Sequence, residues 1–244
     1  MRPEDPPPSR PTRLPGRRPS FGRFRSFGRF RLLIVGVVVV GFLALVSVRG
    51  LAGFYTDYLW FDSLGHSSVF RAVFGAQVVL VLLFMALFFT ILFGNLVVAQ
   101  RLAPPLRPPG PEEDLLVHYH TFVGKRALLV RIVISALFAL VAGLGVSDKW
   151  QDWLLYTNRV DVGVTDTQFG RDLGFYLFQL PFLSFVVGWL FGTLIVTLVV
   201  TSISHYINGG IRLQTVGERV RPEVKAHLSV LLGAIALVRA ADYW

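Results

Sequence analysis

The sequence predicts an all-α protein, a polytopic transmembrane helix bundle of about five spans, and three observations support this prediction. The first is composition, because 53% of the residues are hydrophobic and only 16% are charged, whereas soluble domains average roughly 25% charged residues. The second is that the apolar residues form long segments separated by polar loops. The third is that basic residues concentrate in alternate loops, as they do in membrane proteins.

The chain contains five apolar segments that are candidates for transmembrane helices, since a span needs about 20 mainly apolar residues. We expect the spans near residues 32–54, 72–99, 127–146, 182–203 and 227–243. The charge-free core of the last segment covers only residues 228–238. A soluble core helix or a re-entrant segment would therefore give the same pattern there.

The basic residues predict that the N-terminus lies inside the cell. Residues 1–31 contain nine arginines against Glu4 and Asp5, and two of the four loops, 100–126 and 204–227, are also basic. Lysine and arginine concentrate on the cytoplasmic flanks of transmembrane helices. We therefore expect a multi-pass protein of the bacterial cell (inner) membrane, with its C-terminal end outside. This orientation explains the net charge of +9 without a nucleic-acid partner.

Residues 1–31 are expected to form a disordered basic cytoplasmic tail, and residues 32–244 the transmembrane helical domain. The tail is rich in proline and arginine and cannot bury enough apolar surface to fold alone. A Ser-Phe-Gly-Arg-Phe-Arg repeat at residues 20–25 and 26–31 adjoins the first span. Such a repeat can stack on single-stranded nucleic acid. Its position favours contact with a lipid bilayer carrying anionic headgroups.

A cleaved signal peptide is the alternative interpretation of the first 50 residues. The basic tail is long, the apolar run exceeds a usual signal-peptide core, and no small-residue cleavage site follows it. These features favour a retained first helix.

Two stripes of small residues predict close contacts between helices, because small side chains let neighbouring backbones approach in a membrane. Each stripe repeats every four residues, and a gate or a substrate-lining face is the alternative role. The stripes are Ser135, Ala139 and Gly143 in the third segment, and Ser184, Gly188 and Gly192 in the fourth.

The loop before the fourth segment combines carboxylates with aromatic residues. We predict that it forms a fixed cap on the helices, with its aromatic side chains at the membrane interface and its carboxylates accepting hydrogen bonds from backbone amides. Calcium binding by the carboxylates is the alternative, but their spacing matches no calcium loop. The candidate residues are Asp166, Phe169, Asp172, Phe175, Tyr176 and Pro181.

No cofactor, metal centre or catalytic residue is predicted. The chain has no cysteine, which excludes a thiol nucleophile and a cysteine-based metal site. No nucleophile can be paired with a base, so an enzyme ranks behind the other functional classes.

Three blocks of the sequence resemble a known family. They are LWFDSLGH at residues 59–66, FGRDLGFYLFQLPF at residues 169–182 and HLSV at residues 227–230. Together they resemble uncharacterised protein family 0182, large multi-spanning bacterial membrane proteins, over about residues 54–244. The resemblance implies seven helices followed by a large extracytoplasmic region, so the chain would be an N-terminal fragment or an early-terminating relative. It implies no activity and no catalytic residues.

The expected function is that of a structural or envelope-associated membrane module that anchors a larger extracytoplasmic region, with other membrane subunits as partners. A transporter or channel is the alternative, because polar residues near the middle of the membrane can form a binding site. The candidate residues for such a site are Gln77, Asn95, Thr193, Thr197 and Thr201.

Overall fold

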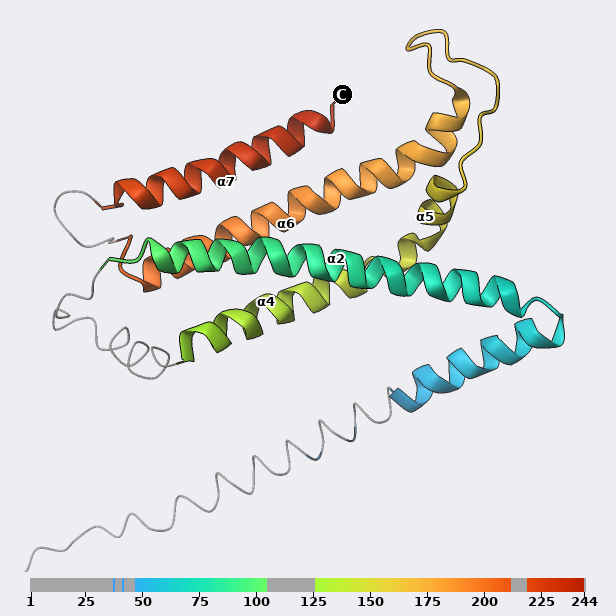
Figure 1. The fold of residues 1–244 in the computed structure, drawn as a ribbon, viewed down its shortest axis with the longest axis horizontal. Coiled ribbons are helices and arrows are strands. Elements are labelled where there is room, and N and C mark those ends of the chain that lie inside the picture. The colour runs from blue at the N-terminus through green and yellow to red at the C-terminus, as the bar shows by residue number, and fades with distance from the viewer. Residues whose placement is uncertain (1–36, 38–40, 42–46, 105–125, 212–218, 244) are drawn as a thin grey trace, which may run out of the picture. The chain divides into compact units, whose positions relative to one another are not determined.

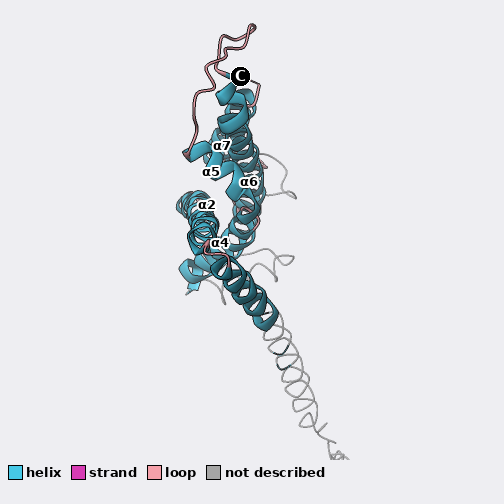
Figure 2. Ribbon diagram, turned by 90° about the vertical axis from the view of Figure 1, so that its right-hand side faces the viewer, coloured by secondary structure: helices cyan, strands magenta, loops and turns pink. Residues whose placement is uncertain are grey.

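The structure is a computed structural model that describes residues 37, 41, 47–104, 126–211 and 219–243 (Figure 1). These residues fall into two compact units, one ending at Ser67 and the other beginning at Ser68. Helices are the regular elements of both units (Figure 2). The described residues contain no strand, only the isolated bridges Thr165–Asp172 and Ile211–Val220. The prediction of an all-helical protein is confirmed.

The first unit contains a helix over residues 47–63. Gly65, with φ of +69°, ends it, and the amides of Gly65 and His66 donate to the carbonyls of Asp62 and Phe61. This paired pattern is a Schellman motif, in which glycine adopts the left-handed conformation. The predicted first span, 32–54, and the tail, 1–31, lie mostly or wholly outside the described residues.

The second unit contains four helices that are long and apolar enough to cross a membrane: α2, α4, η3 with α6, and α7. They match the last four predicted spans. The elements in chain order are α2 (Ser67–Arg101), α4 (Ala127–Leu144), η2 (Ser147–Lys149), α5 (Trp150–Thr157), η3 (Phe175–Gln179), α6 (Leu180–Ile207) and α7 (Pro222–Ala241).

Helix α7 begins five residues before its predicted start. Pro222 occupies its first turn together with Glu223, and proline is favoured there because its fixed φ suits a helix and its missing amide is not needed. The charged side chains Glu223 and Lys225 lower the hydropathy of this turn. A prediction based on apolar runs therefore places the start of α7 too late.

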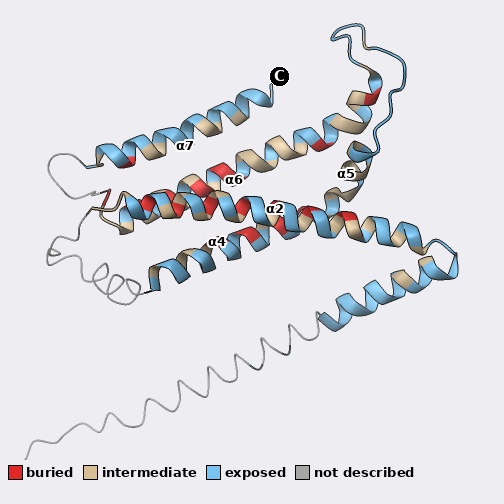
Figure 3. Ribbon diagram, viewed as in Figure 1, coloured by how far each residue is buried: buried red, intermediate tan, exposed pale blue. Residues whose placement is uncertain are grey.

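Helix α2 forms the centre of the second unit. Its buried positions recur every four residues, at Leu80, Phe84, Phe88, Leu92 and Leu96. Residues at this spacing share one helix face, and here that face packs against both α4 and α6. Figure 3 shows the buried residues gathered along α2 and the neighbouring parts of α4 and α6.

Trp189 of α6 connects the three helices. Its ring lies edge-on to Phe84 and Phe88 of α2, with centroids 4.7 and 6.1 Å apart. Its Nε1 donates to the carbonyl of Ala142 on α4 at 3.4 Å. The large aromatic surface is thereby buried while its single polar atom finds an acceptor.

The small-residue stripe of α4 faces α2. Ser135, Ala139 and Gly143 are the buried residues of α4. A Cβ atom at Gly143 would lie 2.7 Å from Met85 Cγ and 3.1 Å from the carbonyl oxygen of Val81. Only a glycine lets the two helices approach this closely.

The small-residue stripe of α6 makes no close contact in the part of the chain that the structure describes. Ser184, Gly188 and Gly192 are exposed, and a Cβ atom at either glycine would have open space around it. Phe185 and Trp189, one position along, turn toward α2 instead, where both rings pair with that of Phe84. A contact between this stripe and another segment stays a prediction.

We expect Gly143→Leu to destabilise the protein, because its side chain must displace Met85 and the backbone of α2. Overpacking of this kind costs about 1–3 kcal/mol. Gly94→Leu, at an exposed position of α2, is the matched control, since the same side chain enters open space there. Thermal unfolding in detergent should show a lower Tm for Gly143→Leu alone. Equal losses in the two variants would contradict the predicted packing.

Candidate functional site

The loop of residues 158–174, between α5 and η3, folds back on itself as a hairpin-like turn. The amide of Asp166 donates to the carbonyl of Arg171 at 2.8 Å, and that of Leu173 to Val164 at 2.9 Å. The turn passes through Gly170, whose φ of +64° is rare for any other residue. The loop therefore has its own network of backbone hydrogen bonds.

Asp172 joins the two sides of this loop by hydrogen bonds. Its Oδ1 accepts hydrogen bonds from the amides of Val162 and Gly174 at 2.9 and 2.6 Å, and its Oδ2 from Gly163 at 2.8 Å. These bonds, led by that from Val162, lower the pKa of Asp172 below its usual value because they stabilise the charged carboxylate.

Glycine is required at position 174 because the two sides of the loop approach each other closely there. It is buried, and a Cβ atom there would lie 2.5 Å from the carbonyl oxygen of Val160 and 2.8 Å from Asp172 Oδ1. Any larger residue at position 174 would push the two sides of the loop apart and break the hydrogen bonds of the Asp172 carboxylate.

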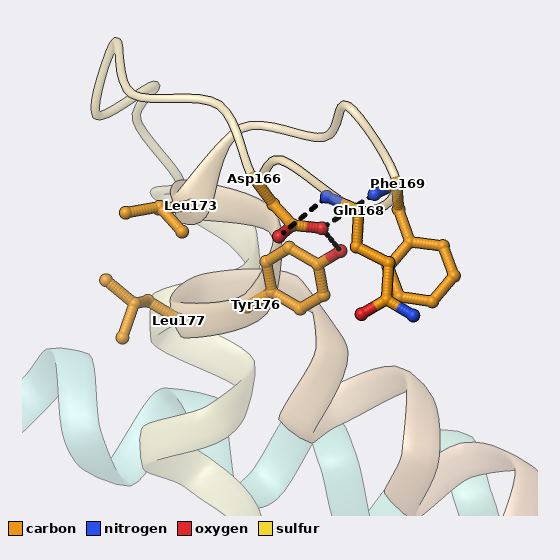
Figure 4. A pocket seen from close by; sticks show the side chains of 6 residues that line it. All are labelled: Asp166, Gln168, Phe169, Leu173, Tyr176 and Leu177. Carbon is orange, nitrogen blue, oxygen red and sulfur yellow. Dashed lines mark hydrogen bonds between the residues drawn. The ribbon is translucent and has the colours of Figure 1, made fainter.

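Asp166 connects the tip of the loop to η3 (Figure 4). Its Oδ2 accepts hydrogen bonds from the amide of Phe169 at 2.8 Å and the hydroxyl of Tyr176 at 3.2 Å, and its Oδ1 from the amide of Gln168 at 3.2 Å. The amide bonds, that of Phe169 first, lower the pKa of Asp166. Both carboxylates thus accept backbone hydrogen bonds, as the sequence predicts.

An open hollow of about 370 Å³ lies beside Asp166. Its rim is apolar and solvent-facing, since Phe169 is 69% exposed and Leu177 58% exposed. The carboxylate oxygens of Asp166 are already bonded to the loop itself (Figure 4). The arrangement suits contact with another apolar surface better than catalysis. The lining residues are Asp166, Gln168, Phe169, Leu173, Tyr176 and Leu177.

The remaining candidate residues belong to the junction between the loop and α6. Phe175 and Tyr176 pack edge-on in the π-helical turn η3, with centroids 5.4 Å apart. The guanidinium of Arg171 lies 4.6 Å from the centre of the Phe175 ring, close enough for a cation–π contact. Pro181 occupies the first turn of α6, where proline is favoured.

The sequence interpretation missed a second polar cluster. Nε2 of His205 lies 3.0 Å from Nδ1 of His227, and Nε2 of His227 lies 3.0 Å from Oδ1 of Asn95. Asn95 was a candidate on its own. The available signal for the histidines was spacing, because His205 continues the stripe of threonines four residues beyond Thr201.

The described residues define an all-helical protein, and four of their helices are able to cross a membrane. The chain belongs to the Uncharacterised protein family (UPF0182), whose family model matches residues 33–244. It is 40% identical over 212 residues to a UPF0182 protein of Frankia casuarinae and 34% identical over 229 residues to one of Streptomyces coelicolor. No solved structure gives a significant match.

The chain spans about a fifth of the length of the curated relatives that it matches. The alignment with the Frankia casuarinae protein covers 87% of this chain and 21% of the relative, and that with the Streptomyces coelicolor protein 94% and 23%. The sequence prediction of the family is confirmed.

We expect Asp172→Ala to lower the Tm, because three backbone amides lose their shared acceptor. Asp161→Ala, in the same loop but at an exposed position, is the matched control and should leave the Tm nearly unchanged. Since the pKa of Asp172 is lowered in the folded state, its contribution is present above the ordinary value of 3.8 and is lost as the pH falls below it. The difference between wild type and Asp172→Ala should therefore shrink below that pH.

Adding calcium tests whether these carboxylates bind a metal ion instead of fixing the loop. A fixed loop needs no added ion, so calcium should leave the wild-type Tm unchanged. A calcium-dependent rise in wild type that is absent from Asp172→Ala would support a metal site instead.

Proposed function

We propose that the chain is the membrane module of a larger envelope protein, which it anchors, and that the 158–174 loop supports an extracytoplasmic region. The observation that carries this proposal is the loop. Asp166 and Asp172 are bonded to amides of the loop itself, while Phe169 and, in the adjoining η3, Leu177 are exposed. A stiff loop with an apolar rim is a suitable support for another domain. The much greater length of the relatives is consistent with such a domain.

The proposed topology has five spans, with the N-terminus inside a bacterial cell membrane. The two basic loops, 100–126 and 204–227, should then share one side. Two contacts support this arrangement: Asn95 near the end of α2 bonds to His227 near the start of α7, and a Cβ atom at Gly209 would contact Pro104 at 3.9 Å. We call this end of the helices the histidine end.

Cysteine labelling tests the topology, because the chain contains no cysteine of its own. Single cysteines at Ser63 and Thr167, both exposed, should react with a membrane-impermeant thiol reagent in intact cells. A cysteine at Gly110 should react only after the cells are opened. Labelling at position 110 but not at 63 or 167 would reverse the orientation.

Substitutions at the apolar rim of the hollow, made in the whole protein, test the anchoring role. Phe169→Asp combined with Leu177→Asp should weaken the contact with the extracytoplasmic region, because charges would be buried against an apolar surface. That region should then be cleaved faster by added protease. Val160→Asp combined with Thr167→Asp, at exposed positions of the same loop that do not line the hollow, is the control. An unchanged cleavage rate in the rim variant would remove the support for this role.

A transporter or channel is the second candidate function. It is favoured by the stripe of Thr193, Thr197 and Thr201, whose side chains are buried along α6. Gln77, another candidate, lies partly buried on α2. Buried polar side chains in apolar helices commonly mark the path of an ion or substrate.

A further inference from the structure

Three polar side chains form a hydrogen-bonded chain at the histidine end. In α2, Oδ1 of Asn95 lies 3.0 Å from Nε2 of His227 of α7. Nδ1 of His227 lies 3.0 Å from Nε2 of His205 of α6. His205 is completely buried. The amide group of Asn95 is oriented by its Nδ2, which donates to the carbonyl of Ile91 at 2.7 Å. Its Oδ1 therefore faces His227.

The direction of the hydrogen bonds follows from this orientation. A carbonyl oxygen only accepts, so Nε2 of His227 carries the hydrogen, and in a neutral imidazole the other nitrogen, Nδ1, is then an acceptor. His205 must donate to it from Nε2. Nδ1 of His205 is left as a lone pair at the end of the chain.

This last nitrogen is buried and has no hydrogen-bond partner among the described residues. A buried acceptor without a partner is costly and rare in folded proteins. Beside it lies Gly210, where a Cβ atom would be 3.6 Å from His205 Nδ1 and 2.9 Å from Val224 Cγ2. Glycine at this position therefore places no side chain beside the nitrogen.

The polar stripe continues from His205 into the apolar part of α6. Thr201 and Thr197 are fully buried, and their hydroxyl oxygens have no hydrogen-bond partner within the described part of the chain. With Thr193 the stripe extends about 18 Å along the helix, at 1.5 Å per residue. It ends next to Trp189, where the aromatic core begins.

No charged side chain is hydrogen-bonded to either imidazole in the described residues. On α7, Glu223 pairs with Arg221 at 3.4 Å, and Lys225 is exposed. Arg219 of the joining loop and Arg101 at the end of α2 are exposed as well. The two histidines are therefore the titratable groups of this cluster.

We propose that His205 and His227 form a site that binds one proton. A hydronium ion transfers its proton to Nδ1 of His205, which leaves water and an imidazolium. The hydrogen bond from Nε2 of His205 to Nδ1 of His227 is then strengthened by the charge. If the Nε2 proton crosses to His227, the charge moves next to Oδ1 of Asn95.

A second proton is excluded because it would give two imidazolium ions whose N–H groups point at each other across 3.0 Å, where like charges disfavour each other. The site therefore switches between zero and one proton. The threonine hydroxyls, which can both donate and accept, extend it toward the middle of the membrane. This role goes beyond anchoring and links the cluster to the transport candidate.

Nitrogen NMR of histidine-labelled protein in lipid nanodiscs tests the proposal directly. At about pH 8 both histidines should carry their hydrogen on Nε2. Acidification to about pH 4.5, a range that brackets the ordinary titration of histidine, should add one proton per chain to this pair. If both remain neutral throughout, the cluster only joins helices and the proposal is wrong.

The variant His205→Gln separates proton binding from helix packing. Its side-chain amide can still donate to Nδ1 of His227, but it has no basic nitrogen, so the proton uptake should disappear while α7 stays in place. His66→Gln, at an exposed position, is the control and should keep the uptake by the pair. Uptake that persists unchanged in His205→Gln would overturn the assignment.

A divalent metal is the competing ligand for two neighbouring imidazoles. Zinc added at neutral pH should leave both signals unchanged if the site binds protons. Loss or shift of both signals at stoichiometric zinc would show a metal site and contradict the proposal. The wild-type signals decide these questions alone, so the test remains decisive even if His205→Gln fails to fold.

Discussion

The apolar stripe of α2 is the contact on which the rest of the second unit depends. Leu80, Phe84, Phe88, Leu92 and Leu96 present one continuous face, and both α4 and α6 pack on it. Apolar lipid gives helices no hydrophobic reason to associate, so close packing must hold them together. Gly143 supplies this packing on the α4 side and Trp189 on the α6 side. Once these helices are fixed, the loop and the histidine cluster are positioned at their ends.

The two ends of the helices are stabilised in different ways. At one end, Trp153 and Tyr156 of α5 pack against Phe182 at the start of α6, with centroids 5.3 and 5.2 Å apart, and the 158–174 loop satisfies its own carboxylates. At the histidine end, the helices are joined by hydrogen bonds between Asn95, His227 and His205. At the first end Asp166 and Asp172 accept hydrogen bonds from backbone amides, whereas at the second end Nδ1 of His205 is buried without a partner in the part of the chain that the structure describes. Change in protonation or ligation is therefore expected at the histidine end.

The sequence predicts those features that depend on residues close together in the chain. Long apolar runs identify α2, α4, α6 and α7, and carboxylates in a glycine-containing loop predict acceptors for nearby amides, which Asp166 and Asp172 are. It does not identify which face of α6 is buried, because Gly188 and Trp189 are neighbours and only the partner helix selects between them. It also does not pair His205 with His227, since the loop between them hides their proximity. The short helix α5 is missed because eight residues give too brief a pattern.

The cost of the unsatisfied polar atoms argues for their use. Ser and Thr in an apolar helix commonly return their hydroxyl to the carbonyl one turn earlier, as Thr90 does to Ala86 and Ser202 to Leu198. Thr197 and Thr201 do not do so in the described part of the chain. Valine would fill the same volume without a buried hydroxyl. A stripe that keeps two such hydroxyls in line with an unpartnered imidazole nitrogen is poorly explained by packing alone, and a role in accepting and passing protons accounts for all three atoms together.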